Sequence, residues 1–118
     1  MTKSELKELL NSLDIPVGEG EQFLDKSKEY PKIAYWEYNW RDVMASGDDY
    51  DEVVTYQISF VSKTPRHRKL LELKMALNGI GLHPEISHEY VKAQNGPGEY
   101  HSYFAIDVTE ALSWLTTE

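Results

Sequence analysis

The feature that most constrains the fold is a change of hydrophobic period between residues 53 and 77. In the first part every second residue is apolar, and these residues are Val54, Tyr56, Ile58 and Phe60. The residues that alternate with them are mostly polar: Val53, Thr55, Gln57 and Ser59. This alternation predicts an antiparallel β-strand with one buried face and one polar outer face.

The second part of the same stretch has helical spacing. Its leucines recur every three to four residues, at Leu70, Leu73 and Leu77, and so form one apolar stripe. Thr64 is a suitable N-cap, Pro65 a suitable first helical residue, and Asn78-Gly79 a suitable end. We therefore predict a helix of about four turns that packs its leucines on the sheet.

The N-terminal third predicts one helix and one strand. Thr2 and Glu5 form a capping-box pattern before a stripe of leucines, Leu6, Leu9, Leu10 and Leu13. Residues 14–31 carry glycine and polar groups, and we expect an irregular connection there. Residues 32–40 are rich in strand-favouring types, with Ile33 and Tyr35 predicted on one face and Ala34, Trp36, Tyr38 and Trp40 on the other.

The C-terminal third predicts two strands, over residues 86–93 and 100–108, joined by the turn sequence AQNGPGE. In the second strand one face carries Ser102, Phe104, Ile106 and Val108. Residues 109–115 predict a short closing helix. The whole chain, residues 1–118, is expected to form a single domain. Its class is α+β, a mostly antiparallel sheet of about four strands with two main helices packed on it.

The chain offers no recognisable chemistry. It has no cysteine, which excludes thiolate catalysis and thiolate metal sites. No Gly-x-Ser-x-Gly elbow or phosphate-binding loop occurs, and His83 and His88 are spaced to point to opposite faces of a strand. We expect no catalytic, cofactor or metal site, and a protein that is not an enzyme. No apolar run approaches the ~20 residues of a membrane span, so no membrane partner is expected.

Charge is the most informative feature of the surface. The formal net charge is -8, which argues against general nucleic-acid binding. A basic cluster nevertheless lies beside the predicted helix start, at Lys63, Arg66, Arg68 and Lys69. The densest acidic run is Asp48, Asp49, Asp51 and Glu52. The strand between these runs has about ten residues, or ~33 Å, which leaves either solvent or a partner for each run. Because they are the two densest runs of opposite charge, we predict that the acidic run of one copy faces the basic cluster of its neighbour. Trp36 and Trp40 are further candidates for an interface, because Trp often anchors one.

The order of these segments resembles the tail completion (tail terminator, or tail-to-head joining) proteins of long-tailed bacteriophages and prophages. The resemblance spans residues 6 to 108. It lies in the leucine-rich helix, the IPV motif, Phe23, YPKIAYWEY, the acidic SGDDYDE, TYQISFVSKTPRHRKLLELKMAL and the final strand EYHSYFAIDV. These are patterns of order and residue class, and they carry over no individual functional residue.

The resemblance implies a non-enzymatic virion protein that forms a ring, typically of six subunits, at the head-proximal end of the tail. Such a ring ends the tail tube and joins it to the head connector, so the implied partners are further copies, the tail tube protein and the connector or stopper protein. DNA passes through the lumen without specific binding. The protein would occupy the host cytoplasm during assembly and then the tail-head junction. Two alternatives remain open, a head-side adaptor or minor capsid protein and a small intracellular protein-binding module.

Overall fold

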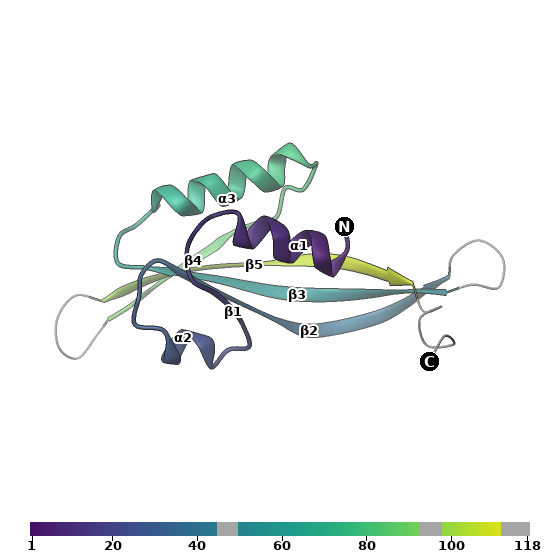
Figure 1. The fold of residues 1–118 in the computed structure, drawn as a ribbon, viewed down its shortest axis with the longest axis horizontal. Helices are drawn as coiled ribbons and strands as arrows, with labels where there is room; N and C mark the ends of the chain where they lie inside the picture. The colour runs from purple at the N-terminus through teal and green to yellow at the C-terminus, as the bar shows by residue number, and fades with distance from the viewer. Residues whose placement is uncertain (45–49, 93–97, 112–118) are drawn as a thin grey trace.

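The computed structural model describes residues 1–44, 50–92 and 98–111. Its helices are α1 (Lys3–Asn11), α2 (Phe23–Lys26) and α3 (Arg68–Gly79), and its strands are β1 (Val17–Glu19), β2 (Lys32–Met44), β3 (Tyr50–Ser62), β4 (Ser87–Val91) and β5 (Glu99–Ala111). The strands form one sheet in the order β1-β2-β3-β5-β4. Figure 1 shows α1 and α3 on one face of this sheet and α2 on the other. We call the first the helix face and the second the opposite face.

The predicted α+β class is confirmed, while its details need correction. The sheet has five strands and is mixed, because β1 runs parallel to β2 and the other neighbours are antiparallel. Both β1 and α2 lie inside the segment 14–31 that was predicted to be irregular. At Gly18 a Cβ would come within 2.2 Å of the Phe23 ring. The absence of a side chain at Gly18 therefore allows the Phe23 ring of α2 to lie directly on β1.

The core lies between the sheet and the two helices on the helix face. β3 is buried on both faces over much of its length, because Thr55, Ser59 and Val61 on its predicted outer face are also buried. The predicted core faces of β3 and β5 are confirmed, and Val54, Tyr56, Ile58, Phe60, Ser102, Phe104, Ile106 and Val108 are all buried. Leu6 and Leu10 of α1 and Leu73 and Leu77 of α3 cover them. Burial of these apolar side chains is the main stabilising contribution to the fold.

The helix α3 begins later than predicted. His67 is its N-cap, and the His67 Nδ1 atom accepts a hydrogen bond from the Lys69 backbone N–H at 3.0 Å. Arg66 has a left-handed backbone, with φ of 50°, which a right-handed helix cannot include. Thr64 and Pro65 therefore lie in the preceding turn. Lys63 and Arg66 are outside the helix, and only Arg68 and Lys69 lie in its first turn.

A β-bulge in β2 reverses the predicted relation of the two tryptophans. The register shifts between Glu37 and Asn39, so that Trp36 lies opposite Gln57 but Trp40 lies opposite Val54. Residues opposite each other in an antiparallel pair share a face, and Val54 is buried on the helix face. Trp40 therefore lies on the helix face and Trp36 on the opposite face, because one extra residue changes the alternation.

The end of the chain also differs from the prediction. β5 continues as a strand through Ala111, so residues 109–111 are not helical. Residues 112–118, the remainder of the predicted closing helix, lie outside the described residues. The sheet is long, with principal extents of 56, 28 and 22 Å for the molecule. Figure 1 shows the start of β3 and the ends of β2 and β5 projecting beyond the helices.

Candidate assembly surfaces

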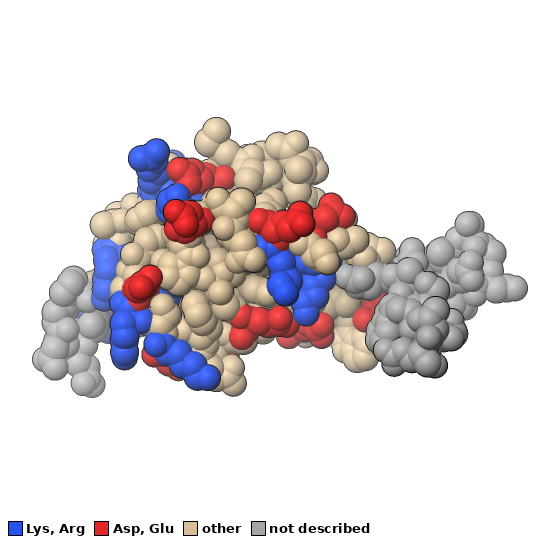
Figure 2. Space-filling view, in the orientation of Figure 1, with Lys and Arg blue, Asp and Glu red and all other residues tan. Residues whose placement is uncertain are grey.

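The two ends of the sheet carry the groups that sequence analysis selected. We call the end of β3 at Ser62, with the start of α3, the basic end, and the start of β3 at Tyr50 the acidic end. Figure 2 shows many of the Lys and Arg side chains at the basic end, left in the view, with a second group near the centre between acidic side chains. Glu52 and Lys63 lie at opposite ends of β3, which confirms the predicted separation of these two residues.

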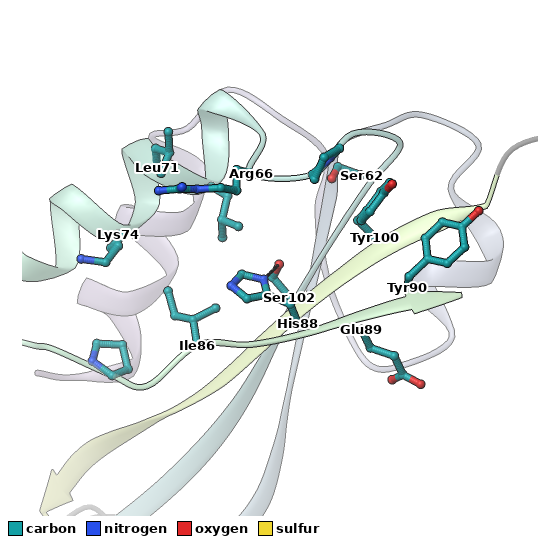
Figure 3. Close-up of a pocket in the computed structure, with 13 residues that line it drawn as sticks. Ser62, Arg66, Leu71, Lys74, Ile86, His88, Glu89, Tyr90, Tyr100 and Ser102 are labelled. Atoms are coloured by element: carbon teal, nitrogen blue, oxygen red, sulfur yellow. Dashed lines mark hydrogen bonds between the residues drawn. The ribbon is translucent and has the colours of Figure 1, made fainter. Parts of the chain in front are cut away.

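A groove at the basic end lies between α3 and β4 and has a volume of about 680 Å³. Its walls are largely apolar, with Leu70 and Leu71 from α3 and Ile86 from the segment before β4. Arg66, Lys74 and His88 add basic groups around this apolar surface (Figure 3). At one end the rings of Tyr90 and Tyr100 pack with centroids 5.0 Å apart.

Of the predicted basic cluster, only Arg66 lines this groove. Its side chain is exposed, and no hydrogen bond or ion pair of Arg66 occurs within the part of the chain that the structure describes. A left-handed backbone at a non-glycine residue costs free energy. The turn therefore places the exposed Arg66 guanidinium at the groove, and it holds the Arg66 backbone in a conformation that arginine does not prefer.

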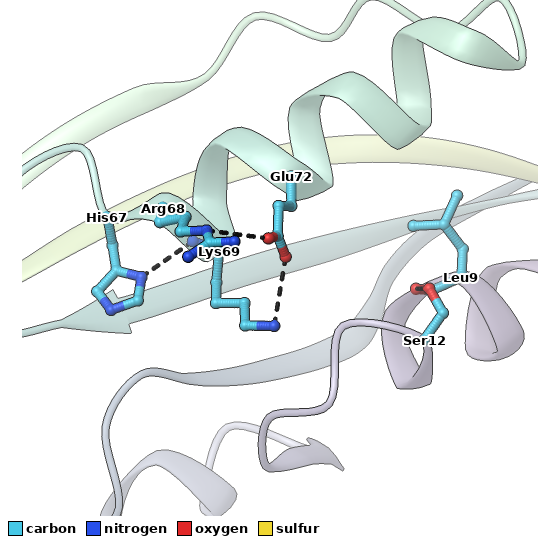
Figure 4. A network of polar contacts seen from close by, with 6 residues as sticks. All are labelled: Leu9, Ser12, His67, Arg68, Lys69 and Glu72. Atoms are coloured by element: carbon cyan, nitrogen blue, oxygen red, sulfur yellow. Dashed lines mark hydrogen bonds and ion pairs between the residues drawn. The ribbon is translucent and has the colours of Figure 1, made fainter.

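Arg68 and Lys69 have an acidic partner within their own helix. Glu72 lies 3.4 Å from the Arg68 Nε atom and 3.3 Å from the Lys69 Nζ atom (Figure 4). Positive charge in the first turn opposes the helix dipole, and Glu72 offsets part of that cost at the expected i,i+3 and i,i+4 spacing. The intramolecular partner was not identified from the sequence, although the spacing to Glu72 could have indicated it.

Lys63 takes part in a different cluster, on the opposite face. Its Nζ atom lies 4.4 Å from the centroid of the Tyr30 ring, and the Nζ atom of Lys32 lies at the same distance. Tyr30 donates a hydrogen bond from its hydroxyl to Glu99. This bond raises the pKa of Tyr30 to about 12 and, as the largest cause, lowers the pKa of Glu99. The cluster fixes the segment before β2 to the start of β5.

Lys32 is a buried lysine within this cluster, with 2 % of its surface exposed. Its ammonium group donates to the backbone carbonyl oxygens of Leu24 and, at 2.9 Å, of Ser27. Burial lowers the pKa of Lys32. These bonds attach α2 to β2, so Lys32 has a structural role in positioning the basic end.

At the acidic end, the described part of the predicted acidic run is small. Asp48 and Asp49 lie outside the described residues, and only the backbone pairing of Asp51 is described. Glu52 is half-buried. Its strand partners are Asp42 and Glu110, so three acidic residues occupy paired positions on three neighbouring strands. Sequence analysis missed Asp42 and Glu110, because only the strand register shows that they join this group.

The predicted aromatic candidates separate into two environments. Trp36 is half-buried, which suits packing on the sheet. Trp40 is 67 % exposed and Tyr38 is 60 % exposed, and both lie at or just after the bulge of β2. Exposed large aromatic residues are typical of interfaces.

The same region contains one structural acid. Asp107 accepts a hydrogen bond from the Thr55 hydroxyl at 2.6 Å and lies 3.3 Å from the Arg41 guanidinium. The Thr55 bond is the main cause that lowers the pKa of Asp107.

Residues 1–44, 50–92 and 98–111 contain no group of three or more His, Asp or Glu residues arranged to hold a metal ion. His88 instead pairs with Ser102, with 2.8 Å between Nδ1 and Oγ. None of the described helices is long and apolar enough to cross a bilayer. Comparison of the chain with protein-family models and with curated proteins gives no match.

Proposed function

We propose that the chain is a non-enzymatic component of a bacteriophage or prophage virion. In this proposal, copies form a ring, of six subunits by analogy, at the head-proximal end of the tail. The ring ends the tail tube and joins it to the head connector, and DNA passes through its lumen without specific binding. The protein acts in the host cytoplasm during assembly and then resides at the tail-head junction.

The observation that carries the proposal is the separation of charge along one sheet. Lys63 and Arg66 lie at one end of β3 and Glu52 lies at the other. A surface that pairs one end of a molecule with the other end of its neighbour is heterologous, and it produces a ring when the rotation closes. Attraction between opposite charges favours that pairing, and repulsion between like charges disfavours contact between two basic ends or two acidic ends.

Sedimentation velocity and electron microscopy of the purified protein test this proposal. We expect a ring with a central hole, weakened by salt because Lys63 and Arg66 at the basic end are exposed. Reversing two bases, Arg66→Glu with Arg68→Glu, should abolish the ring. The matched control is Lys26→Glu with Lys28→Glu, which changes the net charge equally at α2 and should leave the ring intact.

Two results would contradict the proposal. One is an oligomer whose size is the same in the Arg66/Arg68 variant and the wild type, at both low and high salt. The other is a wild-type protein that stays monomeric even when mixed with purified tail tubes of the phage that encodes it. Binding to the head connector but not to tail tubes would instead identify a head-side adaptor.

A second function, a small protein-binding module, is favoured by the exposure of Tyr38 and Trp40. Such a module would be monomeric alone and would bind its partner through these exposed aromatic residues of β2. Trp40→Ala would then abolish binding without any effect of Arg66→Glu. The two functions therefore differ in which end of the molecule the partner requires.

A further inference from the structure

The groove between α3 and β4 is suited to a ligand that combines apolar and acidic groups. Leu70, Leu71 and Ile86 supply apolar contact area, and Arg66 and Lys74 supply positive charge. Glu89 is an acid among the lining residues, but Figure 3 shows its side chain directed away from Arg66 and Lys74. A phosphate backbone would use the bases and leave the apolar walls unused, so a peptide is the better fit.

The chain itself contains a peptide of this composition after β5. Leu112, Trp114 and Leu115 are apolar, and they lie between Glu110 and Glu118. Leucine and tryptophan side chains could enter between α3 and β4 while the carboxylates meet Arg66 and Lys74. Buried aromatic and apolar anchors supply most of the free energy of such interfaces, and the charges fix the orientation.

The strand register separates the apolar residues of this peptide from the centre of their own groove, so we assign the peptide in a groove to another copy. Ser102, which lines the groove, pairs with His88, and Ala111 pairs with Asp51 at the acidic end. The nine residues from Ser102 to Ala111 span ~30 Å along β5. Residues 112–115 extend at most ~14 Å from Ala111, so they cannot reach the centre of their own groove.

The register also places the end of β5, from which this peptide continues, beside the described part of the acidic run. Asp51 lies opposite Ala111, and Glu52 lies opposite Glu110. A neighbour that presents its acidic end to the basic end therefore brings residues 112–115 to the same place. The charged contact and the apolar contact then occur together.

We infer that residues 112–118 of one copy dock in the α3–β4 groove of the next copy. This inference deepens the proposed function and rests on it for the arrangement of copies, since it names the second contact of the head-to-tail interface. Apolar side chains of the segment fill the groove, and its one acidic side chain, Glu118, lies near Arg66 and Lys74. The interface then depends on apolar burial as well as on charge.

A binding experiment tests the docking directly. The probe is a fluorescein-labelled peptide of residues 110–118, added to the full-length protein at a concentration where it is monomeric, with anisotropy as the readout. We expect saturable binding that weakens about tenfold or more with Arg66→Glu and Lys74→Glu together, as loss of interface charge pairs predicts. Lys7→Glu together with Lys28→Glu is the matched control and should bind as the wild type does. Equal binding of a peptide with Trp114→Ser and Leu115→Ser would overturn the inference.

An assembly experiment separates this inference from the proposed function. Trp114→Ser with Leu115→Ser in the full chain should reduce ring formation, whereas Thr116→Ala with Thr117→Ala should not. If the first variant assembles normally while Arg66→Glu with Arg68→Glu does not, the inference is wrong and the proposed ring stands. If no ring forms but the peptide binds in the charge-dependent way above, the docking stands and the ring is wrong.

Discussion

The basic and acidic ends belong to one sheet but differ in how they are supported. At the basic end, α3 covers the sheet, His67 caps the helix, Lys32 attaches α2 to β2, and Tyr30 attaches the segment before β2 to β5. At the acidic end the strands project beyond the helices (Figure 1), and Trp40 is exposed on a face that is core elsewhere. One end is therefore built mainly for stability, while the other has surface that the fold itself does not need.

The largest expected effect is on the free energy of unfolding, and it distinguishes a core residue, Phe60, from an exposed residue, Trp40. Phe60 is fully buried beneath the helix face at the basic end, and Phe60→Ala should lower the free energy of unfolding by ~3–5 kcal/mol. Trp40→Ala at the projecting end should change it by no more than ~0.5 kcal/mol. Urea denaturation followed by circular dichroism measures both. A similar loss in the two variants would show that the acidic end is also part of the core.

Acid titration compares a structural carboxylate at the basic end, Glu99, with one in the middle of the sheet, Asp107. The pKa of Glu99 is lowered mainly by the Tyr30 hydrogen bond, and the pKa of Asp107 mainly by the Thr55 hydrogen bond. A folded pKa below the unfolded value stabilises the protein above the unfolded pKa, and this stabilisation is lost as the pH falls through the folded pKa.

The wild type should therefore lose stability below about pH 4.5, near the unfolded pKa values, and Glu99→Gln and Asp107→Asn should each flatten that loss. Denaturant midpoints measured between about pH 6 and about pH 3 check this. If the denaturant midpoint of a variant falls with pH as steeply as that of the wild type, the carboxylate replaced in that variant does not contribute to the loss of stability in acid.

A smaller effect is expected at the turn before α3. Arg66 has φ of 50°, a conformation that glycine adopts without steric cost. Arg66→Gly should stabilise the fold by up to ~1 kcal/mol, while it removes a base from the groove and weakens assembly. Arg66→Lys is the control that keeps the charge and the strain. Loss of stability in Arg66→Gly, measured by thermal unfolding, would show that the arginine side chain supports the turn.

The smallest expected effect concerns Glu72. Glu72→Gln removes ion pairs to Arg68 and Lys69, both at the surface, and should lower stability by no more than ~0.5 kcal/mol. It should also increase the positive potential of the basic end, so assembly should strengthen at low salt. Sedimentation velocity at two ionic strengths measures this. Weaker assembly would indicate that Glu72 contacts the partner directly.

The sequence predicted the elements whose pattern is long and regular. The alternation in β5 and the leucine stripe of α3 identified the buried faces correctly, because each repeats a period over several residues. In β3 the alternation identified the core face but not the burial of Thr55 and Ser59 on the other face. The short strand β1 has three residues and no period to detect, so it was missed together with α2. Its position depends on the pairing of Val17 with Ile33, which is a long-range contact.

The surfaces were less predictable for a related reason. The basic cluster was visible as composition, but its division among a turn, a helix and the Tyr30 cluster depends on the backbone of Arg66 and on partners distant in sequence. The groove joins α3 to β4 and β5, so Lys74, His88 and Tyr100 could not be grouped from local pattern. Asp42 joins Glu52 only through the register of β2 and β3.

Because of the bulge at Tyr38, the number of residues in β2 determines which face of the sheet each later side chain occupies. Removing one residue there would restore regular alternation and leave residues 32–36 in place. Everything beyond would change phase: Trp40 and Asp42 would turn to the opposite face, away from Val54 and Glu52. A single-residue deletion would thus exchange the two faces of β2 beyond the bulge without changing the residue types there. The surface of this end therefore depends on the number of residues in β2 as well as on their chemistry.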